Sequence, residues 1–156
     1  MSIKTALIFG VNGQDGSYLA RHLCDLGYIV YGAVKRKLDN YDNLNFFELL
    51  SFNNFKLSQI DITKKTQIRS FLKSNHIDEI YNLAAQSSSI LSLSYPALTA
   101  EITAFGALNI LNEIHEASKN IKYFQASSSE IFCKSANTII NENSIYNPTT
   151  PYGTSK

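Results

Sequence analysis

Cysteine and charge are both scarce in this chain of 156 residues. Its two cysteines, Cys24 and Cys133, are too few for a disulfide framework, and no metal-ligand spacing surrounds them, so we expect no metal site. Charged residues make up 17% of the sequence and the net charge is +1, which argues against proteins held on nucleic acid or on a membrane surface by charge. The sequence also lacks an apolar run as long as a membrane span and a signal-peptide pattern, so we expect a cytoplasmic protein.

The length allows one good hydrophobic core, and the sequence contains no repeat, low-complexity segment or linker. Strand-like apolar runs at 5–9, 29–34, 55–60, 79–83 and 121–126 alternate with helical patterns at 17–26, 43–50, 64–75 and 96–117. This alternation predicts an α/β fold, a doubly wound parallel sheet of the Rossmann type, with ligands beyond the carboxyl ends of the strands. Gly27 is predicted to end the first helix and Cys24 to lie in its core face. In the last helix, the residues predicted to face the core are Ile102, Leu108, Leu111 and Ile114.

The clearest local signal is the glycine-rich segment that follows the first predicted strand. Its glycines have the spacing GxxGxxG and lead directly into a helical pattern. Glycine lets the backbone turn tightly and approach a pyrophosphate, whose charge then faces the N–H groups of the helix N-terminus. A tight turn alone would also use glycines, but the strand–turn–helix context favours nucleotide binding. The residues of this predicted phosphate loop are Gly10, Val11, Asn12, Gly13, Gln14, Asp15 and Gly16.

The ends of three further predicted strands carry residues suited to the rest of a dinucleotide. Lys35 and Arg36 stand where an NAD site has an acidic residue, so their charge favours the 2′-phosphate of NADP, although a solvated basic loop is the alternative. Asp61 could accept a hydrogen bond from the adenine amino group, or it could only lead into the next helix. Ile62 follows Asp61 and is predicted to bind the cofactor with it. The segment after the fourth strand contains small residues, which would let a cofactor lie against the backbone. These last residues are Leu83, Ala84, Ala85, Gln86 and Ser87, although the serines at 87–89 could equally form a polar loop.

The candidates for catalysis follow the fifth strand and occupy the last residues of the sequence. Glu130 could carry a proton if it is buried, whereas a lone glutamate is more often a surface residue. Tyr152 and Lys156 are four residues apart, and a helix would place them on one face. Since an ammonium group stabilises a neighbouring phenolate, this pair could act as a base at neutral pH.

Together these segments resemble the amino-terminal half of an extended short-chain dehydrogenase/reductase, and specifically the GDP-mannose 4,6-dehydratase family. The resemblance runs from Lys4 to Lys156 and is most specific in the segments GQDGSYL at 13–19 and EIYNLAAQS at 79–87. It implies a lyase of nucleotide-sugar metabolism that uses NADP. The implied reaction converts GDP-mannose to GDP-4-keto-6-deoxymannose.

The resemblance also implies roles for individual residues. Tyr152 would take the proton of the C4 hydroxyl while hydride passes to the nicotinamide, and Ser128 would hydrogen-bond the C4 oxygen. Glu130 would remove the C5 proton before water leaves from C6 and the hydride returns there. Lys156 would hold the nicotinamide ribose and tune Tyr152.

Several positions depart from the usual pattern of these proteins. Phe9 stands where threonine is usual, Ser128 where threonine is more frequent, and Leu98 where a tyrosine usually contacts the cofactor. Ser129 precedes Glu130, whereas dTDP-glucose dehydratases have an aspartate at this place. This last difference favours the GDP-mannose type.

Members of the family continue for roughly as many residues again, and that part holds most sugar-nucleotide contacts. The expected organisation is therefore an NADP-binding Rossmann domain over residues 1–156 without the substrate-binding domain. We expect the chain alone to be weakly active or inactive, because positioning supplies much of catalysis. A full-length form would bind GDP-mannose or a related sugar nucleotide and would form a homo-oligomer. The alternatives are a stand-alone NADP-binding module and a sugar-nucleotide epimerase or reductase, and Glu130 argues against the epimerase.

Overall fold

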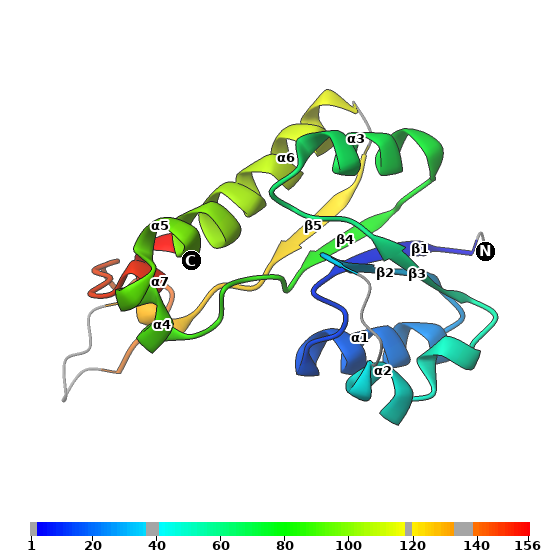
Figure 1. The fold of residues 1–156 in the computed structure, drawn as a ribbon, viewed down its shortest axis with the longest axis horizontal. Coiled ribbons are helices and arrows are strands. Elements are labelled where there is room, and N and C mark those ends of the chain that lie inside the picture. The colour runs from blue at the N-terminus through cyan, green and yellow to red at the C-terminus, as the bar shows by residue number, and fades with distance from the viewer. Residues whose placement is uncertain (1–2, 37–40, 118–119, 133–138) are drawn as a thin grey trace.

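A parallel sheet of five strands in the order β3-β2-β1-β4-β5 lies at the centre of the molecule (Figure 1). The computed structural model describes residues 3–36, 41–117, 120–132 and 139–156. The predicted α/β class and Rossmann-type sheet are confirmed, and the predicted strand positions agree with the observed ones to within a residue at each end. The strands are β1 (Thr5–Phe9), β2 (Ile29–Val34), β3 (Phe55–Gln59), β4 (Glu79–Asn82) and β5 (Lys122–Gln125).

Helices cover both faces of the sheet. In Figure 1, α1 (Gln14–Asp25) and α2 (Asp42–Phe46) lie below it, and α3 (Lys65–Ser74) and α6 (Gly106–Glu116) lie above it. Every residue of β1 is buried as a result. Alternate side chains of this strand belong to the two separate core clusters, which explains its continuous apolar sequence.

The first helix begins earlier than predicted. α1 starts within the predicted phosphate loop, at Gln14, with Gly13 as its N-cap. Gly27 follows the helix with a φ of 81°, the left-handed conformation expected of a glycine at this position. Cys24 is buried in the core as predicted, and its burial raises the pKa of the thiol to about 11. Cys133 lies outside the described residues.

The predicted helix over 96–117 is a helical run of three parts: α5 (Pro96–Thr99), a π-helical segment (Ala100–Phe105) and α6. A further helix, α4 (Ser89–Ser94), was not predicted, because its serine-rich start reads equally well as a polar loop. Within the described ranges, none of the helices has the length and apolar character needed to cross a bilayer.

The predicted inward face of the helical run 96–117 is only partly correct. Ile102 and Ile114 pack against the core as expected. The prediction that Leu108 and Leu111 face the core is wrong, because their residues are 48% and 45% exposed.

The rotation of α6 is set instead by a close approach and by paired polar side chains. Gly106 packs on Ile62, and a Cβ there would lie 2.6 Å from Ile62 Cδ1. Asn109 donates from Nδ2 to the carbonyl oxygen of Ile62 at 3.0 Å. Glu113, which is 2% exposed, accepts from Arg69 Nε of α3 at 2.8 Å. These partners let polar residues occupy the buried face, so the two leucines lie outside it.

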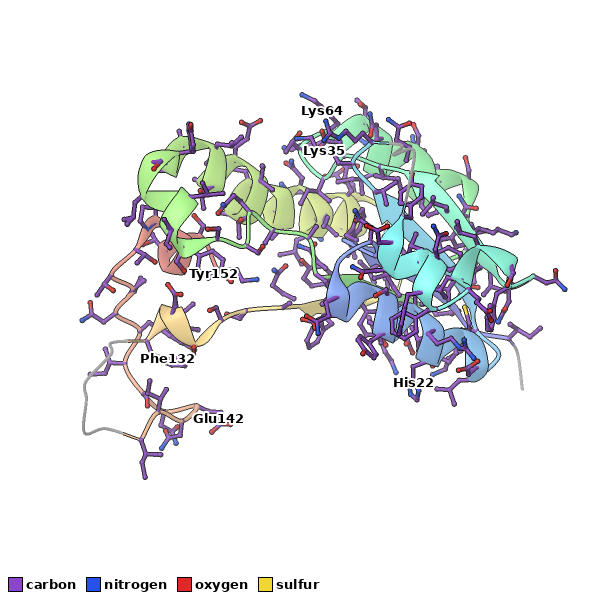
Figure 2. All side chains as sticks on the ribbon, turned by 60° about the horizontal axis from the view of Figure 1, so that its bottom comes forward. His22, Lys35, Lys64, Phe132, Glu142 and Tyr152 are labelled. Atoms are coloured by element: carbon purple, nitrogen blue, oxygen red, sulfur yellow. The ribbon has the colours of Figure 1, made fainter. Side chains whose placement is uncertain are left out.

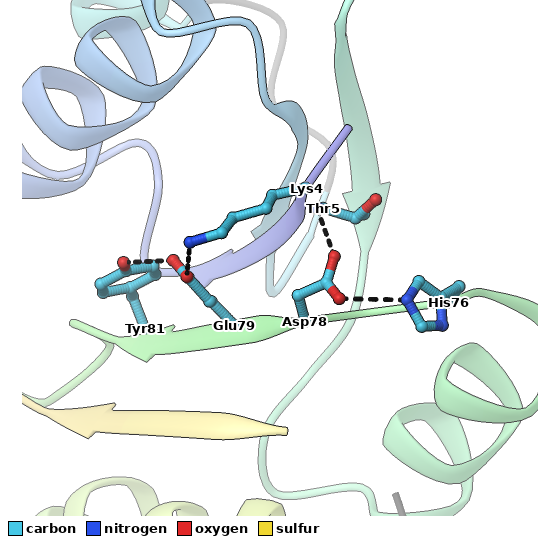
Figure 3. A network of polar contacts seen from close by, with 6 residues as sticks. All are labelled: Lys4, Thr5, His76, Asp78, Glu79 and Tyr81. Atoms are coloured by element: carbon cyan, nitrogen blue, oxygen red, sulfur yellow. Dashed lines mark hydrogen bonds and ion pairs between the residues drawn. The ribbon is translucent and has the colours of Figure 1, made fainter. Parts of the chain in front are cut away.

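A polar network fastens the amino-terminal ends of β1 and β4 (Figure 3). Lys4 Nζ lies 3.1 Å from Glu79 Oε1, and the Tyr81 hydroxyl donates to Glu79 Oε2 at 2.8 Å. Beside them, Asp78 Oδ2 accepts from the backbone N–H of Thr5 at 2.8 Å. These contacts join two strands that are neighbours in the sheet but far apart in the sequence.

The network favours the ionised form of both carboxylates. The hydrogen bond from the Thr5 N–H holds the pKa of Asp78 below its usual value. Burial alone would raise the pKa of Glu79, but the contacts with Tyr81 and Lys4 outweigh it and the pKa is lowered. Burial, together with the hydrogen bond to the Glu79 carboxylate, raises the pKa of Tyr81 to about 12.

We predict that acid destabilises the fold through this network. Since the pKa values of Asp78 and Glu79 are lower in the folded chain than in the unfolded one, their stabilisation is present at neutral pH and is lost as the pH falls below about 5 and through the lowered pKa values. Glu79→Gln should lower the free energy of unfolding at neutral pH by about 1–3 kcal/mol and flatten this decline. Urea unfolding over this pH range measures both effects. The control is Glu142→Gln at an exposed position, and an equal response of the two variants would contradict the prediction.

Candidate functional site

A cavity of about 370 Å³ opens at the carboxyl edge of the sheet, where the strand order reverses between β1 and β4. The glycine loop bounds one side of it, and the segment after β4 bounds another. Most of the residues predicted to bind the cofactor therefore meet in one place. The lining residues are Phe9, Gly10, Asn12, Gly13, Ala33, Val34, Lys35, Ile60, Asp61, Ile62, Leu83, Ala84, Ala85, Ser87 and Ile102.

Gly10 turns the chain at the end of β1 with a φ of 78°. A Cβ at this position would lie 2.8 Å from the backbone nitrogen of Ala84. Gly16 approaches the carbonyl oxygen of Gly10 so closely that it also has no room for a side chain. The loop is closed by a hydrogen bond from the Gly13 N–H to the same oxygen, at 3.0 Å. This part of the cavity wall is thus backbone, as close binding of a phosphate requires.

The other residues of the predicted phosphate loop differ in whether their side chains are exposed or buried. Gln14 and Asp15 are exposed in the first turn of α1, whereas the side chain of Val11 is fully buried in the core, so that only its backbone is available. The carbonyl oxygen of Asn12 accepts from Asn43 Nδ2 of α2 at 2.9 Å. Asn43 supports the loop but was not predicted, because it has no motif and lies 31 residues further along the chain.

Charged groups meet at the ends of β2 and β3. Lys35 Nζ lies 3.8 Å from Asp61 Oδ2, and the lysine side chain is 62% exposed. Asp61 Oδ1 also accepts from the N–H and the hydroxyl of Thr63, both at 2.9 Å, so the aspartate shapes the turn before α3 as well as lining the cavity. An ion pair this exposed contributes little stability, and the ammonium remains accessible to a ligand. Arg36 is exposed and does not line the cavity.

The segment 83–87 runs along the cavity, and all of its residues except Gln86 line it. The backbone N–H of Gln86 donates to Thr103 Oγ1 at 3.1 Å, which ties the segment to the π-helical turn. The side-chain Oε1 of Gln86 is buried and has no hydrogen-bond partner within the described part of the chain. A buried acceptor without a partner costs free energy, and Gln86 lies outside the cavity lining.

A second polar network joins the ends of β4 and β5. The buried Asn82 donates from Nδ2 to Gln125 Oε1 at 2.9 Å, and the Tyr123 hydroxyl donates to the same oxygen. Asn82 Oδ1 accepts from the Ala84 N–H at 3.2 Å, and Gln125 Nε2 donates to the carbonyl oxygen of Ala126 at 3.2 Å. The network therefore orients the two segments that leave these strands.

The turn after β5 carries the first two catalytic candidates. Ser128 precedes the 3₁₀ helix Ser129–Ile131, and its Oγ accepts from the Glu130 N–H at 3.2 Å. The partly buried carboxylate of Glu130 accepts from Ser89 Oγ at 2.5 Å on Oε1 and from Thr150 Oγ1 at 3.1 Å on Oε2. Neither hydroxyl was among the predicted site residues.

Helix α7 (Pro151–Ser155) brings the other two candidates to this turn. Tyr152 and Lys156 lie on one side of it, with the ammonium nitrogen 5.8 Å from the centre of the phenol ring. Lys156 Nζ also donates to the carbonyl oxygen of Ala126, and burial lowers the pKa of the lysine. Gly153 packs directly on the carbonyl oxygen of Glu130, with no room for a side chain. Figure 2 shows Tyr152 between the α5–α6 run and the segment that leads to Phe132.

Part of the apolar lining of the cavity was not predicted as site residues. Phe9, Ala33, Val34 and Ile60 carry no motif, but each lies at or just beyond the carboxyl end of a strand. The rule that ligands bind beyond these ends would have found them. Ile102 reaches the cavity from the π-helical segment, where its predicted inward orientation was the available signal.

Sequence similarity to a known family covers all the residues of the candidate site. The sequence model of the family described as GDP-mannose 4,6 dehydratase matches residues 7–156. The chain is 36% identical over 162 residues to GDP-mannose 4,6 dehydratase 2 of Arabidopsis thaliana, covering 98% of this chain and 43% of that protein. It is 36% identical over 163 residues to GDP-mannose 4,6-dehydratase of Vibrio cholerae, covering 100% and 43%. The chain thus spans less than half the length of these relatives.

Solved structures share the fold. The UDP-Glc/GlcNAc 4-epimerase of Campylobacter jejuni matches 98% of this chain with 46% of its own, at a TM-score of 0.88 and 18% identity. A UDP-glucose-4-epimerase of Stenotrophomonas maltophila, solved with bound NAD, matches 98% of this chain with 45% of its own, at a TM-score of 0.86 and 19% identity. At such identities the likeness concerns the fold alone. The sequence match, in contrast, includes the glycine loop, the turn after β5 and α7, and the chain therefore belongs to the GDP-mannose 4,6-dehydratase family.

Proposed function

We propose that this chain is the NADP-binding and catalytic part of a GDP-mannose 4,6-dehydratase. The observation that carries the proposal is the attachment of α7 to the turn after β5. Thr150 donates to the Glu130 carboxylate and Lys156 to the Ala126 carbonyl, so a carboxylate and the pair of Tyr152 and Lys156 lie in one cluster.

This cluster is joined to the cavity by a short piece of chain. Ser87 lines the cavity, and Ser89, two residues further on, contacts Glu130. Groups that can move protons are therefore next to the space in which a cofactor would lie. A carboxylate and a phenol paired with an ammonium are the types of group needed to remove a C–H and an O–H proton.

The lining of the cavity supports a dinucleotide with a 2′-phosphate as the proposed ligand. Its wall at Gly10 is bare backbone, and a Cβ there would fill the space. Lys35 lines the cavity with an exposed ammonium, and neither residue that follows β2 is acidic, which supports NADP over NAD. When bound, the cofactor supplies a group that accepts hydride from C4 of the sugar and returns it to C6.

The residues of the chain would handle the protons. Tyr152, with the Lys156 ammonium stabilising its phenolate, takes the proton of the C4 hydroxyl, and Ser128 hydrogen-bonds the same oxygen. The ketone formed at C4 acidifies the C5 proton, which Glu130 would remove and pass to the C6 hydroxyl as this group leaves as water. Hydride at C6, together with a proton taken up from solvent at C5, would then give a 4-keto-6-deoxy sugar.

The proposed organisation separates cofactor binding from substrate binding. Residues 1–156 would form the cofactor-binding domain, and a full-length protein would add the part that binds the sugar nucleotide. Because the chain spans 43% of the length of its relatives, we expect it to bind cofactor without efficient turnover.

The first prediction of the proposed function concerns cofactor choice. Calorimetric titration of the 156-residue chain should show tighter binding of NADP than of NAD. Lys35→Ala should weaken NADP binding by roughly tenfold, the loss expected when one charged hydrogen bond is removed, and should leave NAD binding unchanged. Lys64→Ala is the control, since Lys64 is an exposed lysine outside the cavity lining (Figure 2). Equal losses for both cofactors would contradict a contact with the 2′-phosphate.

The second prediction uses two glycines with the same backbone conformation. Gly10→Ala places a Cβ against the backbone of Ala84, whereas Gly27→Ala meets nothing within 4 Å, although φ is 78° and 81° respectively. Gly27→Ala should lose about 1 kcal/mol of stability through backbone strain, and Gly10→Ala should lose more because its Cβ also meets the backbone of Ala84. Gly10→Ala should in addition lose detectable NADP binding, while Gly27→Ala should bind as the parent does. Retained binding in Gly10→Ala would show that the loop does not hold the cofactor.

The third prediction tests the reaction. In D₂O, a full-length protein that contains these residues should convert GDP-mannose to the 4-keto-6-deoxy product with solvent deuterium at C5, as followed by proton NMR. Glu130→Gln should abolish both product and C5 exchange, with Glu142→Gln as the exposed control. Product formed without C5 exchange would exclude the proposed role of Glu130, and efficient turnover by the 156-residue chain alone would contradict the proposed division of the site.

A further inference from the structure

Two hydroxyl groups from separate helices hold the two oxygens of the Glu130 carboxylate. Ser89 Oγ of α4 donates to Oε1 at 2.5 Å, and Thr150 Oγ1, at the start of α7, donates to Oε2 at 3.1 Å. We propose that Ser89 and Thr150 are positioning residues that aim the Glu130 carboxylate and keep it ionised. We refer to these two side chains as the hydroxyl clamp.

The Ser89 hydroxyl is not needed to form its own helix. The N-cap of α4 is Ser88, whose Oγ accepts from the Leu91 N–H at 3.2 Å. The further contact within the helix, from Ser92 Oγ, uses the backbone oxygen of Ser89 and leaves its hydroxyl aside. The hydroxyl is therefore directed to Glu130, which lies 41 residues away in the sequence.

Thr150 has two functions that one hydroxyl can satisfy together. Its Oγ1 accepts from the Gly153 N–H at 3.0 Å, which caps α7, and it donates its own proton to Glu130. A hydroxyl has one donor and two acceptor lone pairs, so the two bonds do not compete. The atom that begins the helix of Tyr152 and Lys156 thus also holds the carboxylate.

The clamp has the polarity that an ionised carboxylate needs. Hydrogen bonds donated to a carboxylate favour its charged form, and two donors on different oxygens also restrict its rotation. Helix α4, with the sequence SILSLS, brings no ionisable side chain to the site, and α7 brings Tyr152 and Lys156. A group that removes a proton must begin ionised and must point at the substrate. That Glu130 is such a group rests on the proposed function.

The test is made on the 156-residue chain without cofactor or sugar. With glutamate labelled by ¹³C at the carboxyl carbon, the Glu130 resonance is identified by its absence in Glu130→Gln, and its titration is followed by NMR. Ser89→Ala should raise the titration midpoint by roughly half a unit to one unit, because one donor to the charged form is lost. Ser88→Ala is the matched control, since it removes the cap of α4 but no contact with the clamp, and it should leave the midpoint unchanged.

Thr150 is tested with variants that separate its two functions. Glycine is nearly as good an N-cap as threonine but has no hydroxyl, so Thr150→Gly should keep α7 and raise the Glu130 midpoint. Thr150→Ser keeps both bonds and should restore the parent value. Amide spectra recorded on the same samples show whether α7 is retained.

An unchanged Glu130 midpoint in both Ser89→Ala and Thr150→Gly would overturn the clamp, as would an equal shift in Ser88→Ala. This outcome is distinct from failure of the proposed function, which would appear as no C5 exchange in the unmodified full-length protein. If that protein is active, Ser89→Ala should lower kcat several-fold with little change in KM, and Ser89→Thr should restore it.

Discussion

The approach of Gly10 to the backbone of Ala84 is the constraint on which the site depends. It is possible because β1 and β4 are neighbours in the sheet and their chains leave it at the same edge. A Cβ at Gly10 would lie 2.8 Å from Ala84 N, so any other residue would force the two segments apart. The wall of the cavity and the course of segment 83–87 both follow from this contact.

The positions of β1 and β2 could be predicted from the sequence because both faces of the sheet are covered at these strands. Such strands are uninterrupted apolar runs, and β1 and β2 have the bounds that these runs indicate. The orientation of α6 could not be predicted in the same way. Periodicity identifies apolar residues but not the partners that allow Asn109 and Glu113 to be buried, so Leu108 and Leu111 were placed on the wrong side.

In the site, too, local patterns could be predicted from the sequence and contacts between distant residues could not. The glycine loop and the ends of the strands are local sequence patterns. They were enough to predict that most of these residues lie around one cofactor site. The contacts around Glu130 join residues 41 and 20 positions apart, through serine and threonine side chains that are common everywhere in the chain. Only the arrangement of α4 and α7 distinguishes Ser89 from the serines beside it, since Ser88 caps the helix and Ser87 lines the cavity.

The two halves of the site are held by different kinds of interaction. The cavity is an extension of the hydrophobic core, and residues such as Phe9 and Ile62 belong to both. The cluster around Glu130 is attached through directional polar bonds, such as those of Thr150 and Lys156, and the rings of Phe132 and Tyr146 stack beside it with their centres 5.4 Å apart. Packing tolerates small rotations of a side chain, whereas a hydrogen bond weakens quickly when its angle changes. A reactive carboxylate needs that angular restraint, and a pair of hydroxyls on two helices supplies it without adding charge.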